Sequence, residues 1–147
     1  IGAIGKLEPN NIYIENGYRS VTDRLGRLKN VSGELHLTPS TRDLAAQAEA
    51  RGMGLPTDDA GHMIGARFGG PSGLTNLVPQ NANLNRGAWK SMENEFAQHV
   101  RNGEKVNVTV KPNYTDSNLR PDSFTVKYTV NDGKVHTKYF ENTGATS

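Results

Sequence analysis

The C-terminal third of the chain alternates apolar and polar residues, and this alternation constrains the fold more than any other feature. A period of two residues is typical of a strand with one buried face, and it predicts strands at 105–111, 124–130 and 134–140. Asp132-Gly133 separates the last two strands, and such a dipeptide is a strong signal for a tight hairpin. The sequence therefore predicts a C-terminal antiparallel β-meander.

Two helices and two shorter strands are expected before the meander. The strands are 12–18, which includes a turn at Asn16-Gly17, and a short strand at 35–37. One helix runs from 42 to 51 and ends at Gly52, and the other covers residues 89–100 and ends at Asn102-Gly103. Apolar residues at helical spacing support both helices: Leu44, Ala45 and Ala48 in the first, and Trp89, Met92, Phe96 and Val100 in the second.

The segment 63–84 carries four glycines, two prolines and several asparagines, and it predicts a long irregular stretch of the kind that is usually functional in a compact domain. Together these elements predict an α+β fold, with a loop-and-helix module at about 57–100 flanked by antiparallel strands. We expect a single domain over residues 1–147. Its first residue is Ile1 and not Met, which indicates a processed chain or an excised domain.

Composition excludes several classes of protein. The chain has no cysteine, so a disulfide scaffold, a zinc ribbon and a thiol nucleophile are excluded. It has no apolar run long enough for a membrane span and no signal peptide at its start. The formal net charge is +2, so a polyanionic partner would have to bind a local basic patch.

The run Asp59-Ala60-Gly61-His62 in the central module is the first candidate for chemistry. Histidine is the side chain best suited to accept a proton from water near neutral pH, and the preceding glycine allows close approach of backbone or substrate. A histidine beside the apolar pair Met63-Ile64 is also compatible with a hydrogen-bonded structural residue. The residue pattern by itself leaves both readings open.

Asn85 and Glu93 are the second candidate. On one continuous helix they would differ by about 80° in direction and about 12 Å along the axis, so they could share a hydrated cation but not a bare one. Mg²⁺ suits such a site because it keeps several waters. In the alternative reading, Asn85 is a helix N-cap and Glu93 a solvated partner of Lys90. Arg86 and Lys90 either contact phosphate or form a solvated face.

These motifs resemble a known family. Three motifs carry the resemblance: Asp59-x-Gly61-His62, Asn76-Leu77-Val78-Pro79-Gln80 and Leu84-Asn85-Arg86-Gly87-Ala88-Trp89-x-x-x-Glu93. They resemble the DNA/RNA non-specific endonucleases, which are sugar-non-specific nucleases with a ββα-metal core. Further segments resemble the branch found as C-terminal toxin domains of bacterial polymorphic toxins, namely Tyr18 to Arg27, Arg67-Phe68-Gly69-Gly70 and Arg120-Pro121-Asp122-Ser123-Phe124.

The resemblance implies a role for each matching residue. His62 would be the general base, Asn85 the direct ligand of Mg²⁺, with Mn²⁺ as a substitute, and Glu93 the holder of a metal-bound water. Asn76 and Asp59 would complete the catalytic group by organising the site.

One departure concerns position 60, where the family often has an arginine that would contact phosphate and this chain has Ala60. The candidates to replace it in substrate binding are Arg67, Arg86 and Lys90, and the sequence does not favour one of them over the others.

The implied function is an Mg²⁺-dependent endonuclease that hydrolyses phosphodiester bonds of DNA, or of RNA, with little sequence preference. As part of a polymorphic toxin it would be secreted from a bacterium, act in the cytoplasm of a target cell and be neutralised by an acidic immunity protein. Two alternatives are a nucleic-acid-binding domain that keeps the fold without turnover, and an interaction domain in which the central asparagines only cap turns.

Overall fold

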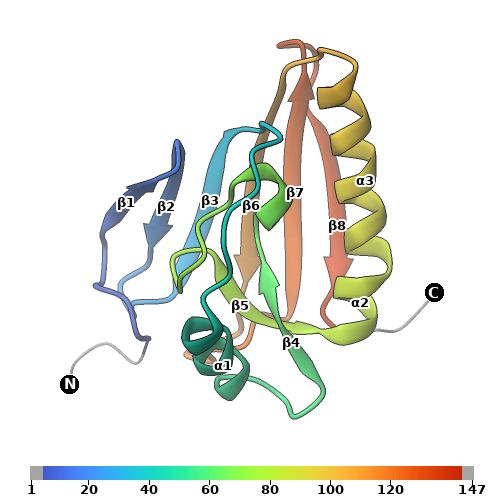
Figure 1. Ribbon diagram of the computed structural model, residues 1–147. Coiled ribbons are helices and arrows are strands. Elements are labelled where there is room, and N and C mark those ends of the chain that lie inside the picture. The colour runs from blue at the N-terminus through green and yellow to red at the C-terminus, as the bar shows by residue number, and fades with distance from the viewer. Residues whose placement is uncertain (1–4, 144–147) are drawn as a thin grey trace.

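A six-stranded antiparallel sheet forms the body of the molecule (Figure 1). The computed structural model describes residues 5–143. The strand order is β1-β2-β3-β6-β7-β8. The strands are β1 (Ile12–Glu15), β2 (Tyr18–Thr22), β3 (Leu28–Glu34), β6 (Val106–Asn113), β7 (Ser123–Val130) and β8 (His136–Glu141).

The central module between β3 and β6 contains a second, two-stranded sheet and the helices. Its strands β4 and β5 are antiparallel, and α2 and α3 follow directly in a ββα arrangement. The elements are α1 (Leu44–Gly52), β4 (Asp58–His62), the 3-10 turn η1 (Ala66–Phe68), β5 (Leu77–Asn81), α2 (Ala82–Arg86) and α3 (Ala88–Arg101). No helix in residues 5–143 has both the length and the apolar character that a membrane crossing requires.

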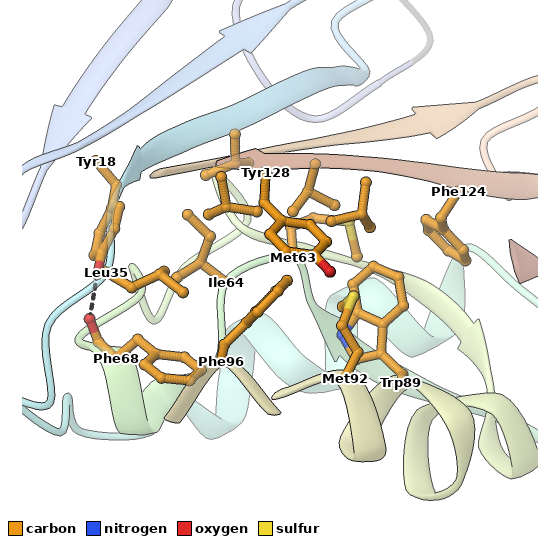
Figure 2. Packing of buried hydrophobic residues seen from close by; sticks show 14 of the residues in the cluster. Tyr18, Leu35, Met63, Ile64, Phe68, Trp89, Met92, Phe96, Phe124 and Tyr128 are labelled. Atoms are coloured by element: carbon orange, nitrogen blue, oxygen red, sulfur yellow. Dashed lines mark hydrogen bonds between the residues drawn. The ribbon is translucent and has the colours of Figure 1, made fainter. Parts of the chain in front are cut away.

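The main core lies between α3 and one face of the large sheet (Figure 2). The ring centroids of Trp89 and Phe124 are 5.3 Å apart, and those of Phe96 and Tyr128 are 4.8 Å apart. The edge-to-face geometry of both pairs is the one that aromatic rings prefer. The apolar stripe of α3 is therefore buried against the alternating residues of β6 and β7, which anchors the helix that follows the candidate site.

The predicted α+β class and the C-terminal meander are confirmed. The last strand begins at His136 and not at 134, because the turn after β7 is longer: Asn131 and Asp132 have positive φ values of 52° and 58°. The first predicted strand ends at Glu15, and Asn16-Gly17, also with positive φ, turns the chain into β2.

The predicted strand at 35–37 is wrong. The strand β3 lies just before this position and ends at Glu34. The Leu35 amide still donates a hydrogen bond to the Val106 carbonyl of the sheet, at 2.8 Å. Gly33 and the polar residues of β3 interrupt the apolar alternation, so the sequence pattern misses the strand.

The irregular segment predicted at 63–84 is only partly irregular, because it contains β5 and α2. Pro79 makes β5 hard to predict, because proline is rare within strands. The strand tolerates Pro79 because β5 pairs with β4 alone and needs no hydrogen-bond donor on its free edge. The helix predicted at 42–51 is present as α1. However, Leu44 is 72% exposed and the buried residues of α1 are Ala46, Gln47 and Ala50.

Candidate active site

The β4–β5 hairpin positions His62 at the end of β4, opposite Leu77. The preceding Gly61 is buried, and a Cβ atom there would overlap the side chain of Gln80 on β5. Glycine is therefore required before His62 for a packing reason, since any larger residue would separate the two strands.

Asn76 fixes the backbone that follows His62. Its side chain is fully buried, its Nδ2 donates to the carbonyls of Ile64 and Pro71 at 2.8 and 2.9 Å, and its Oδ1 accepts from the Ile64 amide at 2.9 Å. The Met63 amide donates to the Asn76 carbonyl at 2.9 Å. Asn76 is thus enclosed by protein, and the geometry allows it to organise the site but not to touch a substrate.

A polar hollow opens at one side of this hairpin. It has a volume of about 310 Å³ and is lined by Arg42, Gln47, Arg51, Asp59, Ala60, His62, Asn85 and Arg86. Of the residues singled out in the sequence, the fold brings Asp59, His62, Asn85 and Arg86 together here. Asn76, Glu93, Arg67 and Lys90 do not line it.

Asp59 connects Asn85 and Arg86 within the polar hollow. The Asn85 Nδ2 donates to Asp59 Oδ2 at 2.9 Å, and the Arg86 guanidinium donates to both carboxylate oxygens at 2.7 and 3.0 Å. With its amino group committed to Asp59, the Asn85 amide presents its Oδ1 away from the carboxylate. Within residues 5–143 this oxygen accepts no hydrogen bond, so it is available to a cation.

Asn85 and Glu93 do not share one helix, so the geometry expected for a continuous helix is wrong. The helix α2 ends at Arg86, and Gly87, with φ −111° and ψ −103°, breaks the chain before α3 begins. A Cβ atom at Gly87 would lie 2.7 Å from the Asn83 carbonyl oxygen, so glycine permits the sharp bend. The N-cap of α2 is Asn81, which accepts from the Leu84 amide, and the N-cap reading of Asn85 is therefore wrong.

Glu93 lies in a less polar environment next to the site. Its carboxylate contacts Gly65, where a Cβ atom would collide with it, and it lines a cavity with Met63 and Phe68. Burial raises the pKa of Glu93 to about 7, although the positive charges of Arg67 and Lys90 act in the opposite direction. The solvated ion pair with Lys90 does not form within the described part of the chain.

The imidazole of His62 is kept neutral by its surroundings. Burial lowers the pKa of His62, and the positive charge of Arg42 lowers it further. Neither ring nitrogen has a hydrogen-bond partner among residues 5–143, and the ring lines the polar hollow. An unprotonated histidine at an open polar site can accept a proton from water at neutral pH.

Sequence reasoning missed Arg42, Gln47 and Arg51, which form the α1 side of the polar hollow. Gln47 and Arg51 are four residues apart and therefore share a helix face with each other, which was a usable signal. The position of Arg42 carried no such signal, because it depends on how the segment before α1 packs on the central module.

Two residues that flank the C-terminal strands, Arg120 before β7 and Asn142 after β8, hold the hairpin in place. Asp58, the residue before Asp59, forms a bidentate ion pair with Arg120 at 2.7 and 3.0 Å. The buried Asn142 accepts from the Asn81 amide at 2.7 Å and donates to the Pro79 carbonyl at 3.2 Å. These bonds tie β4 and the start of α2 to the large sheet, so they fix the elements that carry Asp59 and Asn85.

The sequence of this chain matches a known protein family and several known proteins. Residues 9–132 match the family described as DNA/RNA non-specific endonuclease. The chain is 35% identical over 135 residues to the type VII secretion system protein EssD of Staphylococcus aureus (strain USA300), covering 86% of this chain and 22% of EssD. It is 30% identical over 105 residues to the probable deoxyribonuclease RhsA of Dickeya dadantii (strain 3937), covering 71% of this chain and 7% of RhsA. The chain thus spans less than a quarter of these relatives.

Solved structures show the same fold. The structure of NucA from Streptococcus agalactiae with magnesium ion bound superposes with a TM-score of 0.72 at 18% identity, covering 94% of this chain and 75% of that one. The structure of Sda1 nuclease with bound zinc ion gives a TM-score of 0.68 at 15% identity, covering 92% of this chain and 75% of that one. With the family match over residues 9–132, these findings show that the chain belongs to the DNA/RNA non-specific endonuclease family.

Proposed function

We propose that the chain is an Mg²⁺-dependent endonuclease that hydrolyses phosphodiester bonds of DNA with little sequence preference. One observation carries this proposal: His62, with a lowered pKa, and Asn85, whose Oδ1 accepts no hydrogen bond within residues 5–143, line the same polar hollow. The names of NucA and Sda1, solved with magnesium and zinc ions, support a divalent metal. The name of RhsA, a probable deoxyribonuclease, favours DNA over RNA.

The donor set fits a hydrated Mg²⁺ ion. Residues 5–143 contain no group of three or more histidine and acidic side chains that could hold a metal, which disfavours a cage built from protein ligands alone. Mg²⁺ needs no such cage, because it keeps several waters and takes additional oxygens from substrate phosphate. Asn85 Oδ1 would be the direct ligand, and the bond from Asn85 Nδ2 to Asp59 holds the amide in the required orientation. Once bound, the ion supplies Lewis-acid stabilisation of the charge on phosphate.

In this mechanism His62 transfers the proton and arginine side chains stabilise the charge. His62 accepts a proton from the attacking water as the oxygen of that water forms the new bond to phosphorus. The bond from phosphorus to the 3′ oxygen breaks, and this oxygen takes a proton from solvent, leaving a 5′-phosphate and a 3′-hydroxyl. Arginine side chains in the polar hollow stabilise the negative charge that develops on the phosphate oxygens.

Glu93 would act through a water and not as a direct ligand, since it lies outside the polar hollow. Its carboxylate must be charged for this role. Burial raises the pKa of Glu93 to about 7 in spite of the positive charges of Arg67 and Lys90, so the charged form predominates only above about pH 7. The Arg67 guanidinium donates a hydrogen bond to the Asn94 side chain on α3 at 2.8 Å, which directs it toward this side of the site. We assign Arg67 and Lys90 to the binding of more distant phosphates.

Cleavage of a closed circular plasmid, with Mg²⁺ and with EDTA, tests the proposal. The expected result is nicking followed by degradation in Mg²⁺ and no cleavage in EDTA. A gel shift without cleavage in either condition would instead support a binding domain without turnover. Neither shift nor cleavage would support an interaction domain. The same assay on a transcript of equal sequence decides whether RNA is also cleaved.

We further propose that the domain acts as a secreted antibacterial toxin that is neutralised by an acidic immunity protein. EssD is named as a type VII secretion system protein, which supports secretion. The polar hollow carries three arginines against one aspartate, so an inhibitor that covers it would need carboxylates. Expression in the bacterial cytoplasm should arrest growth and degrade DNA for the wild type but not for His62→Ala. Soluble cytoplasmic expression of the wild type without growth defect or DNA damage would refute a toxin role.

A further inference from the structure

The positive charges around the candidate site fall into two groups. Arg67 and Lys90 act on Glu93, outside the polar hollow. Arg42, Arg51 and Arg86 line the polar hollow together with His62. Position 60, beside them, is an alanine and offers no charge. The second group is therefore the one that shares the polar hollow with His62, and it supplies the candidates for contact with the phosphate there.

Arg86 is already engaged. Its guanidinium forms two hydrogen bonds to Asp59, so both nitrogens that face the carboxylate are occupied. Arg42 and Arg51, in contrast, form no ion pair and no hydrogen bond within residues 5–143, and both side chains are exposed. Two uncompensated positive charges thus face the open hollow, and Asp59, the only carboxylate among the described residues that line it, is already paired.

Arg42 is distinguished from Arg51 by its electrostatic effect on the base and by the support of its backbone. Among the described residues, Arg42 is the arginine whose positive charge lowers the pKa of His62. Its backbone is held on both sides: the Ser40 hydroxyl donates to the Gly70 carbonyl at 2.7 Å, and Asp43 caps α1 by accepting from the Ala46 amide at 3.0 Å. Arg42 is therefore presented to the polar hollow from an anchored segment.

We propose that Arg42 contacts the phosphodiester that is cleaved, in place of the cation that Ala60 does not supply. The proposal rests on the proposed nuclease function and deepens it. A guanidinium can donate two parallel hydrogen bonds to phosphate oxygens, and it stabilises their charge best when that charge increases during attack. Arg42 is thus a catalytic residue, and Arg51 a contact for a neighbouring phosphate.

The test compares Arg42→Ala, Arg42→Lys and Arg51→Ala with the wild type in saturating Mg²⁺. The substrates are duplex DNA and bis(4-nitrophenyl) phosphate, which contains one phosphodiester and no neighbouring phosphate. Arg42→Ala should lose about 10²-fold in rate on both substrates. Arg42→Lys should recover part of that loss, because lysine keeps the positive charge but cannot donate two parallel hydrogen bonds. Arg51→Ala should lose activity on DNA and little on the small diester.

Two controls separate this role from others. Arg101→Ala removes an exposed arginine at the last residue of α3 and should leave both rates unchanged. The loss in Arg42→Ala should persist at about pH 9, where His62 is neutral in either protein. An Arg42→Ala rate within threefold of the wild type on the small diester would overturn the proposal. Recovery at about pH 9 would overturn it as well, because Arg42 would then act only through His62.

DNA binding in EDTA distinguishes failure of this proposal from failure of the nuclease function. A wild type that binds DNA and cleaves neither substrate refutes the nuclease function. The phosphate contact is then tested by the slope of the logarithm of DNA affinity against the logarithm of salt concentration. The magnitude of this slope should be smaller by about 0.9 in Arg42→Ala than in the wild type. An unchanged slope would refute the contact, whether or not the wild type cleaves.

Discussion

Replacing Asp59 with alanine should weaken metal-dependent cleavage without unfolding the protein. The Asp59 carboxylate accepts the hydrogen bond at 2.9 Å that orients the Asn85 amide, and it pairs with Arg86. A hydrogen bond to a charged group contributes about 1.5–3 kcal/mol, and about 1.4 kcal/mol corresponds to a factor of ten. The apparent affinity for Mg²⁺ should therefore fall by about 10- to 100-fold, as is usual when a residue that orients a metal ligand is removed.

The effect on stability should be much smaller. The Arg86 side chain is 73% exposed, and ion pairs at such positions contribute about 0–1 kcal/mol. Arg86→Ala is the matched control, because it removes the same ion pair but leaves the bond between Asn85 and Asp59. The assay is the initial rate of plasmid nicking as a function of Mg²⁺ concentration, with thermal unfolding measured in parallel. An unchanged Mg²⁺ dependence in Asp59→Ala, or an equal shift in Arg86→Ala, would refute the reasoning.

Three further predictions follow from the site. Since its pKa is lowered, His62 stays neutral to a lower pH than an ordinary histidine. In Glu93→Gln, where the raised pKa of Glu93 no longer contributes, the acid limb of kcat/KM should therefore have its midpoint below about 6.5, and a midpoint above this value would contradict the assignment. Asn76→Ala loses three buried hydrogen bonds, so its free energy of unfolding in urea titrations should fall by about 3–5 kcal/mol. The control variant Asn107→Ala, on the outer face of the sheet, should change the free energy of unfolding by less than about 0.5 kcal/mol. Raised Mg²⁺ should partly restore Asn85→Ala but not His62→Ala, with Glu93→Gln intermediate in activity; equal, metal-insensitive losses would count against separate roles.

The sequence predicts best what depends on local periodicity. The meander follows from alternation in β6 and β7, and α3 follows from the spacing of its buried aromatic residues. Both signals are strong because each of these elements buries one face against the same core. β3 and β5 were missed because Gly33 and Pro79 interrupt that alternation, while the pairing of the strands overrides the local preference.

The candidate site was predictable only in part for a related reason. Resemblance to the family singles out His62, Asn85 and Asp59, and the fold brings these three together. The break at Gly87 could not be read from the spacing of apolar residues, because the bend is set by the packing of α2 on β4 and β5. Arg42 was missed because its place near His62 comes from contacts between separate segments, such as that between Ser40 and Gly70.

The role of His62 is the central claim, and cleavage by His62→Ala tests it most directly. The measurement is the rate of plasmid nicking in saturating Mg²⁺ at about pH 8, with DNA binding and thermal unfolding as controls for the fold. A general base contributes about 10²–10⁴-fold in rate, so His62→Ala should lose at least about 10²-fold while it binds DNA and unfolds like the wild type. A folded His62→Ala variant that keeps more than about half of the wild-type rate would make His62 a structural histidine and would contradict the mechanism.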